Sequence, residues 1–274
     1  MIRVPATSAN LGPGFDALGM AVTLYADVGV VGFDDMPEGA HVANDTHPAQ
    51  IAFLRAGGQG QVWTQTNIPM GRGLGFSGAV RIGGVVAAEV QQRGVDTWSR
   101  ETSQALHIGT ELEGHADNVA ASLYGSIVAT ADGRVVKIPT SLDPVFIAWV
   151  PSFTTSTNES RTKLGPVIAF DDAVFNIGRT ALLVAAFAAN DIAALSAATQ
   201  DRLHQDVRFS VAERSRAALE SGIGAGAWCG WLSGSGPTVA LLCDVSDADA
   251  ICAALPPDGD AKQLRIDHEG ARII

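Results

Sequence analysis

The chain has 274 residues, and its 18 Lys and Arg stand against 29 Asp and Glu, which gives a formal net charge of −11 at pH 7. Hydrophobic residues make up 47% of the chain, which excludes intrinsic disorder, and the acidic balance argues against a nucleic-acid binder or a polybasic membrane-surface protein. The three cysteines show no CxxC spacing, and no apolar run reaches the roughly 18 residues of a membrane span. Composition therefore predicts a cytoplasmic protein that has no disulfide framework or cysteine-based zinc site and binds neither nucleic acid nor membranes.

Two features of the composition concern a nucleotide site. Glycine accounts for 30 of the 274 residues, about 11% against a usual share of roughly 7%. Lysine occurs only at Lys137, Lys163 and Lys262, so the GxxxxGK[S/T] phosphate loop is absent from the chain. Any nucleotide site in this protein must therefore work without the lysine of that motif.

The first half of the chain alternates short strands with helices. In chain order, the patterns predict strands at 2–5 and 20–31, a short helix at 48–55, a strand at 61–67, helices at 77–92 and 98–113, and a β-hairpin at 126–138. Ser99 is the candidate N-cap of the helix at 98–113. Two glycines inside the helix at 77–92, Gly83 and Gly84, indicate close packing of that helix on a sheet.

The second half begins with a buried strand at 145–152. Helices are predicted at 170–190, 191–199, 207–221 and 247–255, and strands at 225–232, 238–243 and 263–267. Antiparallel-looking strands interleaved with helices favour the α+β class over a strict βαβ array. Because no proline-rich or low-complexity linker divides the chain, we expect two closely packed halves, 1–142 and 143–274.

Three Gly-rich stretches are the strongest functional signal: PATSANLGPGFDALG at 5–19, PMGRGLGFSGA at 69–79 and LSGSGPT at 232–238. Any one of them alone is more often only a turn. The middle stretch differs because it continues into a predicted helix, whose first N–H groups and about half a unit of positive charge suit a polyphosphate. Backbone amides and Arg72 could then share the charge that a lysine supplies elsewhere.

The order, spacing and residue identity of five motifs resemble the GHMP small-molecule kinases, and among them most closely the homoserine kinases. The motifs are the three Gly-rich stretches, ELEGHADNVAASLYG at 111–125 and DRLHQDVR at 201–208, so the resemblance spans residues 2–244. It implies the GHMP kinase fold, with the active site in the cleft between the two halves. It also implies transfer of the ATP γ-phosphoryl group, with Mg²⁺, to the side-chain hydroxyl of L-homoserine, a step of threonine biosynthesis that yields O-phosphohomoserine. A homodimer is a further expectation.

The resemblance also implies roles for individual residues. The triphosphate-binding residues would be Pro69, Met70, Gly71, Arg72, Gly73, Leu74, Gly75, Phe76, Ser77, Gly78 and Ala79. Mg²⁺ would be bound by Ser77 and Glu113; the amino and hydroxyl groups of the substrate by Asn10, Asp16 and His115; and its carboxylate by Arg161 and Arg208. The residues closest to phosphoryl transfer would be Asn118, Asp16 and Arg72.

Several of these assignments have ordinary alternatives. Glu113 also fits a solvated helix end, Arg161 and Arg208 fit surface ion pairs, and His204 fits a packing or capping role. Asp16 could act as a general base or orient the substrate amine, and we favour the orienting role. The phosphate loop departs from the family's usual GLGSSA, because Phe76 replaces a serine. The alternative functions are a kinase for another small amino or hydroxy acid, such as threonine, and a non-catalytic ligand-binding relative.

Overall fold

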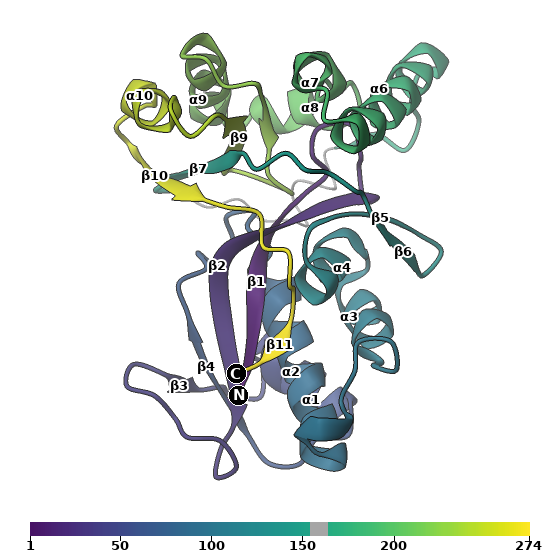
Figure 1. Ribbon diagram of the computed structural model, residues 1–274, viewed down its shortest axis with the longest axis vertical. Coiled ribbons are helices and arrows are strands. Elements are labelled where there is room, and N and C mark those ends of the chain that lie inside the picture. The colour runs from purple at the N-terminus through teal and green to yellow at the C-terminus, as the bar shows by residue number, and fades with distance from the viewer. Residues whose placement is uncertain (154–163) are drawn as a thin grey trace.

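The computed structural model describes residues 1–153 and 164–274, which form strands and helices in alternation along the chain (Figure 1). The strands are β1 (Ile2–Ala9), β2 (Leu18–Val30), β3 (His41–Val42), β4 (Val62–Thr66), β5 (Ile127–Ala131), β6 (Arg134–Lys137), β7 (Val145–Pro151), β8 (Cys229–Leu232), β9 (Val239–Cys243), β10 (Gly259–Leu264) and β11 (Arg272–Ile273). The helices are α1 (Pro48–Arg55), α2 (Phe76–Arg93), α3 (Ala105–Glu113), α4 (Asp117–Tyr124), α6 (Phe170–Ala189), α7 (Ile192–Ala198), α8 (Gln205–Phe209), α9 (Glu213–Gly224) and α10 (Ala248–Ala254).

The described strands form two sheets. The larger has the order β11-β1-β2-β4-β3, with β5 paired to β2 and β6 to β5, and the smaller has the order β10-β7-β9-β8. Every strand pair in both sheets is antiparallel, which confirms the α+β class. Figure 1 shows α1 to α4 on one side of the larger sheet and α6 to α10 above the smaller one.

Close contact between α2 and its neighbours fixes the position of this helix. A Cβ atom at Gly83 would lie 2.4 Å from Val28 Cγ2 on β2, and one at Gly84 would lie 2.2 Å from the carbonyl oxygen of Ala49 on α1. The helix therefore lies directly on the sheet and on α1, as the two glycines indicated. Because α2 also packs against α3 and α4, its first turn is held within a rigid layer.

The helix predicted at 98–113 begins later than expected, at Ala105. The carboxylate of Glu89 on α2 accepts hydrogen bonds from Trp98 Nε1 at 3.0 Å, Ser103 Oγ at 2.6 Å and the Gln104 amide at 2.7 Å. This buried carboxylate holds the chain before α3 in a non-helical path, so Ser99 caps no helix. Sequence periodicity could not predict these hydrogen bonds, because Glu89 lies on another helix.

The helix predicted at 207–221 is two helices, α8 and α9. Ala212 has φ −138° and ψ 55°, which stops the helical path between them. A tertiary contact also fixes the position of α8: Gln205 Oε1 accepts a hydrogen bond from the Leu232 amide of β8 at 2.7 Å. The short strands β3 and β11 and the helix α4 were missed altogether, and the strand predicted at 263–267 lies earlier, at Gly259–Leu264.

The end of the chain returns to the larger sheet. β11 pairs with β1, with Ile273 opposite Ile2 and Arg272 opposite Arg3, and the two chain ends lie side by side (Figure 1). Asp267 fixes this return, because its carboxylate accepts hydrogen bonds from Tyr25 Oη at 2.9 Å and from the Gly270 amide at 2.7 Å. The division of the chain into 1–142 and 143–274 stays a prediction, and the last residues lie in the first of the two sheets.

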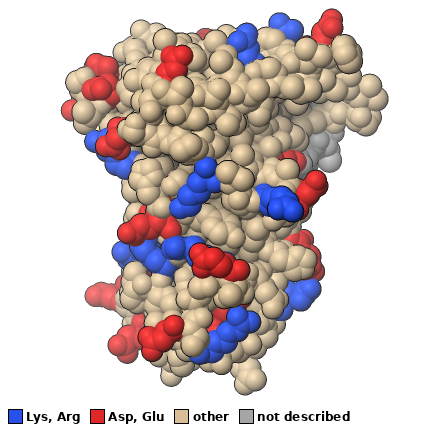
Figure 2. All heavy atoms as spheres, turned by 45° about the vertical axis from the view of Figure 1, so that its right-hand side comes forward, with Lys and Arg blue, Asp and Glu red and all other residues tan. Residues whose placement is uncertain are grey.

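Helix α6 leaves much of its apolar surface exposed. By length and composition alone it could cross a membrane, and 22% of its most apolar window is buried, but one such helix is weak grounds for a membrane protein. Phe170, Val174 and Ile177 are exposed on it. Figure 2 shows acidic and basic side chains interspersed on one face of the molecule, with much of the upper part of that face uncharged.

Candidate active site

The loop before α2 has the backbone of an anion-binding cradle. Gly71, Gly73 and Gly75 all have positive φ, at 67°, 73° and 67°, and the loop ends at Gly75, the N-cap of α2. A Cβ atom at Gly73 would lie 2.1 Å from the carbonyl oxygen of Ser233, and one at Gly75 would lie 1.9 Å from Thr7 Oγ1. Since Gly75 has no side chain to cap α2, the first N–H groups of the helix stay available to a ligand.

A chain of hydrogen bonds joins this loop to the other two Gly-rich stretches. Trp231 Nε1 donates to Ser8 Oγ at 2.9 Å, Ser8 and Ser233 share a hydrogen bond of 2.8 Å, and Ser233 Oγ donates to the carbonyl of Gly73 at 2.6 Å. Because the indole N–H only donates and a carbonyl only accepts, the Ser8 hydroxyl must donate to the Ser233 hydroxyl, and every hydrogen bond of the chain runs from Trp231 toward Gly73. The three stretches therefore meet at one place, and they join the two sheets there.

Asn118 lies beside the first turn of α2. Its Oδ1 accepts a hydrogen bond from Thr7 Oγ1 at 2.7 Å, and its backbone amide donates to Asp117 Oδ1 at 2.7 Å. A Cβ atom at Gly78 would lie 3.4 Å from the Cβ of Asn118, so α4 faces α2 across this short gap. The structure thus brings the side-chain amide of Asn118 next to the glycine cradle.

The loop between β1 and β2 is strained and well anchored. Asn10, Leu11 and Asp16 have φ of 70°, 47° and 58°, values that non-glycine residues adopt rarely. Asn10 Nδ2 donates to the carbonyl of Gly234 at 3.0 Å, while Asn10 Oδ1 accepts from the Asp16 amide at 3.1 Å. Asn10 therefore holds Asp16 against the third Gly-rich stretch.

Asp16, His115 and Asp117 form an acidic cluster whose ligand atoms all lie within 4.8 Å of one another. His115 Nδ1 lies 2.7 Å from Asp117 Oδ1. Burial lowers the pKa of His115, but the hydrogen bond and charge of Asp117, with the charges of Glu113 and Asp16, outweigh burial and raise it. With a protonated His115 the cluster keeps a net negative charge, which suits a ligand's ammonium group.

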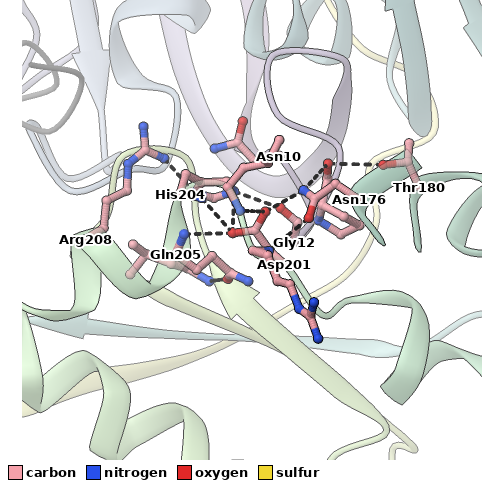
Figure 3. A network of polar contacts seen from close by, with 12 residues as sticks. Asn10, Gly12, Asn176, Thr180, Asp201, His204, Gln205 and Arg208 are labelled. Carbon is pink, nitrogen blue, oxygen red and sulfur yellow. Dashed lines mark hydrogen bonds and ion pairs between the residues drawn. The ribbon is translucent and has the colours of Figure 1, made fainter. Parts of the chain in front are cut away.

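Arg208 belongs to a buried polar network around His204 (Figure 3). Arg208 Nη1 donates to the carbonyl of Gly234 at 2.8 Å and to His204 Nδ1 at 3.0 Å, and the guanidinium lies 5.4 Å from the centre of the Phe15 ring. His204 Nε2 lies 2.8 Å from the carbonyl of Gly12, so the proton is on Nε2. Burial, followed by the charge of Arg208, lowers the pKa of His204 to about 4, against the opposing charge of Asp201.

Asp201 organises the rest of this network. Its carboxylate accepts from the amides of His204 at 2.9 Å and Gln205 at 2.7 Å at the start of α8, and from Asn176 Nδ2 on α6 at 2.6 Å. Burial raises the pKa of Asp201, but the hydrogen bonds from Asn176 and from the amides of Gln205 and His204 outweigh burial and lower the pKa. The DRLHQDVR motif therefore positions Arg208 through His204 and Asp201, a role that the sequence alone left open.

Glu113 does not stand at a solvated helix end. It forms an ion pair with Arg81 of α2, with 2.8 Å between Nη1 and Oε1, and the side chains of Arg81 and Glu113 are only 16% and 13% exposed. Arg81 Nε, Thr110 Oγ1 and Glu113 Oε1 are buried without hydrogen-bond partners among the described residues, so the contact between Arg81 and Glu113 is an ion pair without a well-aligned hydrogen bond.

The predicted site residue Arg72 is engaged by backbone carbonyls, and Arg161 lies outside the described residues. Arg72 donates to the backbone carbonyls of Ser152 at 2.8 Å and Phe153 at 3.4 Å, so it links the glycine loop to the end of β7. Arg161 falls in residues 154–163, outside the described residues. Phe76 packs edge-on against His47, with ring centres 6.0 Å apart.

Sequence reasoning missed several residues of this region. Asp117 could have been predicted from the sequence, because Asp117 follows His115 by two positions in the same motif. Thr7, Ser8, Ser233 and Arg81 gave no separate signal, because their contacts join segments far apart in the chain.

Comparison with known proteins adds the family context. Residues 45–126 match the family profile of the GHMP kinases N terminal domain, and residues 183–260 match that of the GHMP kinases C terminal domain. The chain is 36% identical over 300 residues to the homoserine kinase of Desulfitobacterium hafniense, covering 100% of this chain and 99% of that protein. It is 37% identical over 295 residues to the homoserine kinase of Streptomyces coelicolor, covering 100% and 94%.

Solved structures agree with these matches. The crystal structure of homoserine kinase from Cytophaga hutchinsonii is similar with a TM-score of 0.83 and 26% identity, covering 100% of this chain and 96% of that one. The L. major mevalonate kinase, at 14% identity and a TM-score of 0.71, shows the shared fold alone; the match covers 96% of this chain and 94% of that one.

Proposed function

The chain belongs to the GHMP kinase family, and we propose that it transfers the γ-phosphoryl group of ATP to the side-chain hydroxyl of L-homoserine, releasing O-phosphohomoserine and ADP. The observation that carries the proposal is the convergence of three Gly-rich loops on the open N-terminus of α2, next to an acidic cluster and the buried Arg208. One end of this site suits a polyphosphate, and the other suits an amino acid. A kinase for a small hydroxy amino acid needs both.

The nucleotide end uses the backbone. Phosphoryl transfer needs positioning and charge neutralisation more than covalent help. Residues 69–79 would bind the triphosphate through the amides of the loop and the first turn of α2, whose dipole favours negative charge. Asn118 lies close enough to this turn to orient the transferred group, and Arg72 adds a positive charge to the same loop.

The substrate end offers charges complementary to those of a zwitterionic amino acid: acidic groups for its ammonium group and an arginine for its carboxylate. Asp16 and Asp117, with His115 between them, would bind the ammonium group, and Asn10 fixes the backbone of Asp16. Arg208 would bind the carboxylate, because a guanidinium matches a carboxylate with two parallel hydrogen bonds. Arg161 is the second proposed carboxylate contact. We assign Asp16 to orienting the amine, since Asp16 belongs to the cluster that suits an ammonium group.

Mg²⁺ is part of the proposal, with Ser77 and Glu113 as its protein ligands. Carboxylate and hydroxyl oxygens are the donors that this cation prefers. Glu113 Oε1 lies 2.8 Å from Arg81 Nη1 as an ion pair, but it is buried without a hydrogen-bond partner among the described residues, so this carboxylate could also take a cation. When bound, the cation would neutralise charge on the phosphate oxygens.

A coupled assay of ADP release tests the substrate. Homoserine, threonine, mevalonate, galactose and pantoate are supplied in turn with ATP and Mg²⁺, and we expect the fastest turnover with homoserine. Faster turnover of threonine, with homoserine inert, would move the assignment to the runner-up substrate. Nucleotide binding without transfer to any acceptor would identify a ligand-binding relative instead. Ser77→Ala is the matched control, because it removes a proposed cation ligand and leaves the acidic cluster unchanged.

A homodimer in the cytoplasm completes the proposal. The exposed apolar side chains of α6, including Val174 and Ile177, offer a surface for a second copy, and Cys229, Cys243 and Cys252 are all free, as in a reducing compartment. Light scattering of the purified protein measures its mass directly. A dimer that Ile177→Asp converts to a monomer supports this assembly, and a monomeric wild type contradicts it.

A further inference from the structure

The ion pair between Arg81 and Glu113 joins α2 to the end of α3 beside the glycine cradle. Arg81 uses Nη1 for Glu113 Oε1, and neither its Nε nor Thr110 Oγ1 has a hydrogen-bond partner among the described residues. Thr110 lies three positions before Glu113, on the same face of α3. The guanidinium is therefore held by one contact and keeps donors for another.

Helix geometry directs Arg81 toward the cradle. Arg81 follows Ser77 by four positions on α2, so the two side chains share one face of the helix. Helical side chains lean toward the N-terminus, and a long side chain covers the turn before its own Cα. The charge of Arg81 is thus directed toward the first turn of α2, where the helix dipole is also positive.

Few fixed cations are available to this loop. The first lysine of the chain is Lys137, and Arg72 is engaged with the carbonyls of Ser152 and Phe153. Phosphate oxygens match a guanidinium as well as a carboxylate does, with two parallel hydrogen bonds. An arriving triphosphate therefore competes with Glu113 for Arg81.

We propose that Arg81 is a phosphate-binding residue that Glu113 holds in place until the nucleotide arrives, and that it reduces the dependence of ATP binding on the divalent cation. The inference rests on the proposed function, because it requires the triphosphate at residues 69–79. Arg81 also acts on the cation: a positive guanidinium beside the Glu113 carboxylate weakens its attraction for Mg²⁺. Arg81 and the cation thus share the neutralisation of the same phosphate charge.

Calorimetric titration of ATP, with EDTA and separately with excess Mg²⁺, tests the inference. Arg81→Met should weaken binding of metal-free ATP about tenfold or more, the loss expected from one hydrogen bond between charged groups, and should weaken binding of MgATP much less. Arg81→Lys keeps the charge and should retain most of the metal-free affinity. The matched control is Arg93→Met, which removes the same charge from the exposed last turn of α2 and should leave both affinities unchanged.

Glu113→Gln gives a second and opposite readout. Without its carboxylate partner Arg81 is free for phosphate, so metal-free ATP should bind more tightly than to the wild type. This variant decides the question even if Arg81→Met fails to fold. Equal weakening of both ATP forms by Arg81→Met, or unchanged metal-free binding in Glu113→Gln, would overturn the inference and leave the proposed function standing. A wild type that binds neither form of ATP would instead overturn the proposed function and the inference with it.

Discussion

Arg208 shows how a charged side chain is buried without losing its function. Only 4% of the residue is exposed, yet the guanidinium has the carbonyl of Gly234 and the imidazole of His204 as hydrogen-bond partners and the ring of Phe15 beside it. Each of these partners fixes the plane of the guanidinium, which is what recognition of a carboxylate with two hydrogen bonds requires. A buried charge held in one orientation suits selection among substrates better than a mobile surface arginine does.

Replacing Arg208 should therefore affect the substrate and not the nucleotide. We expect Arg208→Met to raise KM for homoserine about 10-fold to 100-fold, the range of a charge-assisted hydrogen bond, while KM for ATP changes little. Steady-state kinetics with each substrate varied in turn measures this. The control is Arg216→Met, because Arg216 pairs with Asp206 at 2.9 Å on the exposed side of α9. An equal rise of both KM values would contradict a carboxylate contact.

His204 gives the protein a predictable dependence of stability on pH. The unfolded histidine has a pKa of about 6.5, and the folded one has a pKa of about 4, so protonation favours the unfolded chain. The contribution of His204 to stability is complete above pH 6.5 and is lost as the pH falls toward 4. The full loss is about 3 kcal/mol of unfolding free energy.

Urea denaturation at several values between pH 7 and pH 4.5 measures this dependence. We expect the unfolding free energy of the wild type to fall across this window and that of His204→Gln to fall less. His47, whose pKa burial also lowers, contributes in both proteins and cancels in the comparison. Identical pH profiles for the two proteins would show that His204 does not titrate in this way.

At the scale of elements, the loop before α2 matters through its backbone. Gly73 has φ 73°, and a Cβ there would lie 2.1 Å from the carbonyl oxygen of Ser233, whereas at Gly78 a Cβ would lie at an ordinary 3.4 Å from the Cβ of Asn118. The same substitution should thus have opposite effects at two positions five residues apart.

We expect Gly73→Ala to destabilise the protein by about 1–3 kcal/mol and to abolish nucleotide binding, because the loop must change its path. Gly78→Ala should stabilise it by up to about 1 kcal/mol, since alanine is the better helix former. Chemical denaturation and ATP titration of both variants provide the comparison. A Gly73→Ala protein that binds ATP like the wild type would count against the cradle.

Elements governed by local contacts were predicted well. The helix at 48–55 is correct to the residue, because Pro48 occupies its first turn and His47 caps it with Nδ1. The hairpin at 126–138 follows from Asp132 and Gly133, which have φ of 48° and 73° at its turn. Where Glu89 or Gln205 imposed a distant contact, as at α3 and α8, the predicted bounds were wrong.

At the scale of the whole molecule, the chain end closes the structure. After β10, Ile266 bridges Val22 of β2, and the buried Asp267 binds Tyr25 and lies 3.2 Å from Arg272. The second half of the sequence thereby contributes to the first sheet, and the hydrogen bond between Ser8 and Ser233 is a second link between the halves. Two such connections predict that the halves unfold together.

We expect a single unfolding transition, followed by the fluorescence of the buried Trp63 in the first sheet and of Trp149 and Trp231 in the second. Asp267→Ala should lower the unfolding free energy by about 3 kcal/mol, because it leaves the amides of Glu269 and Gly270 and the hydroxyl of Tyr25 without their acceptor. Asp258→Ala, which removes an ion pair between a half-buried aspartate and the exposed Arg214, should change it by less than about 1 kcal/mol. Two separate transitions in the wild type would contradict the coupling of the halves.

The net charge of −11 belongs to the whole molecule and is a poor guide to the site. Acidic and basic side chains are interspersed on the face in Figure 2, while the phosphate loop has Arg72 on it and Arg81 one turn into α2. Charged ligands respond mainly to the groups within about 8–10 Å in salt, so the local placement of these arginines and of the acidic cluster matters more than the net charge.

The sequence by itself determined the family, the α+β class and the three Gly-rich stretches, because these depend on residue identity and short-range periodicity. The tertiary structure decided which side chains meet. Three contacts illustrate this: the pairing of Arg81 with Glu113, the His204 network under Arg208, and the donor chain from Trp231 to Gly73. Each includes a contact between residues at least 32 positions apart in the sequence. Such contacts follow from the packing of whole elements, since helix and strand periodicity constrain only neighbours within a few residues.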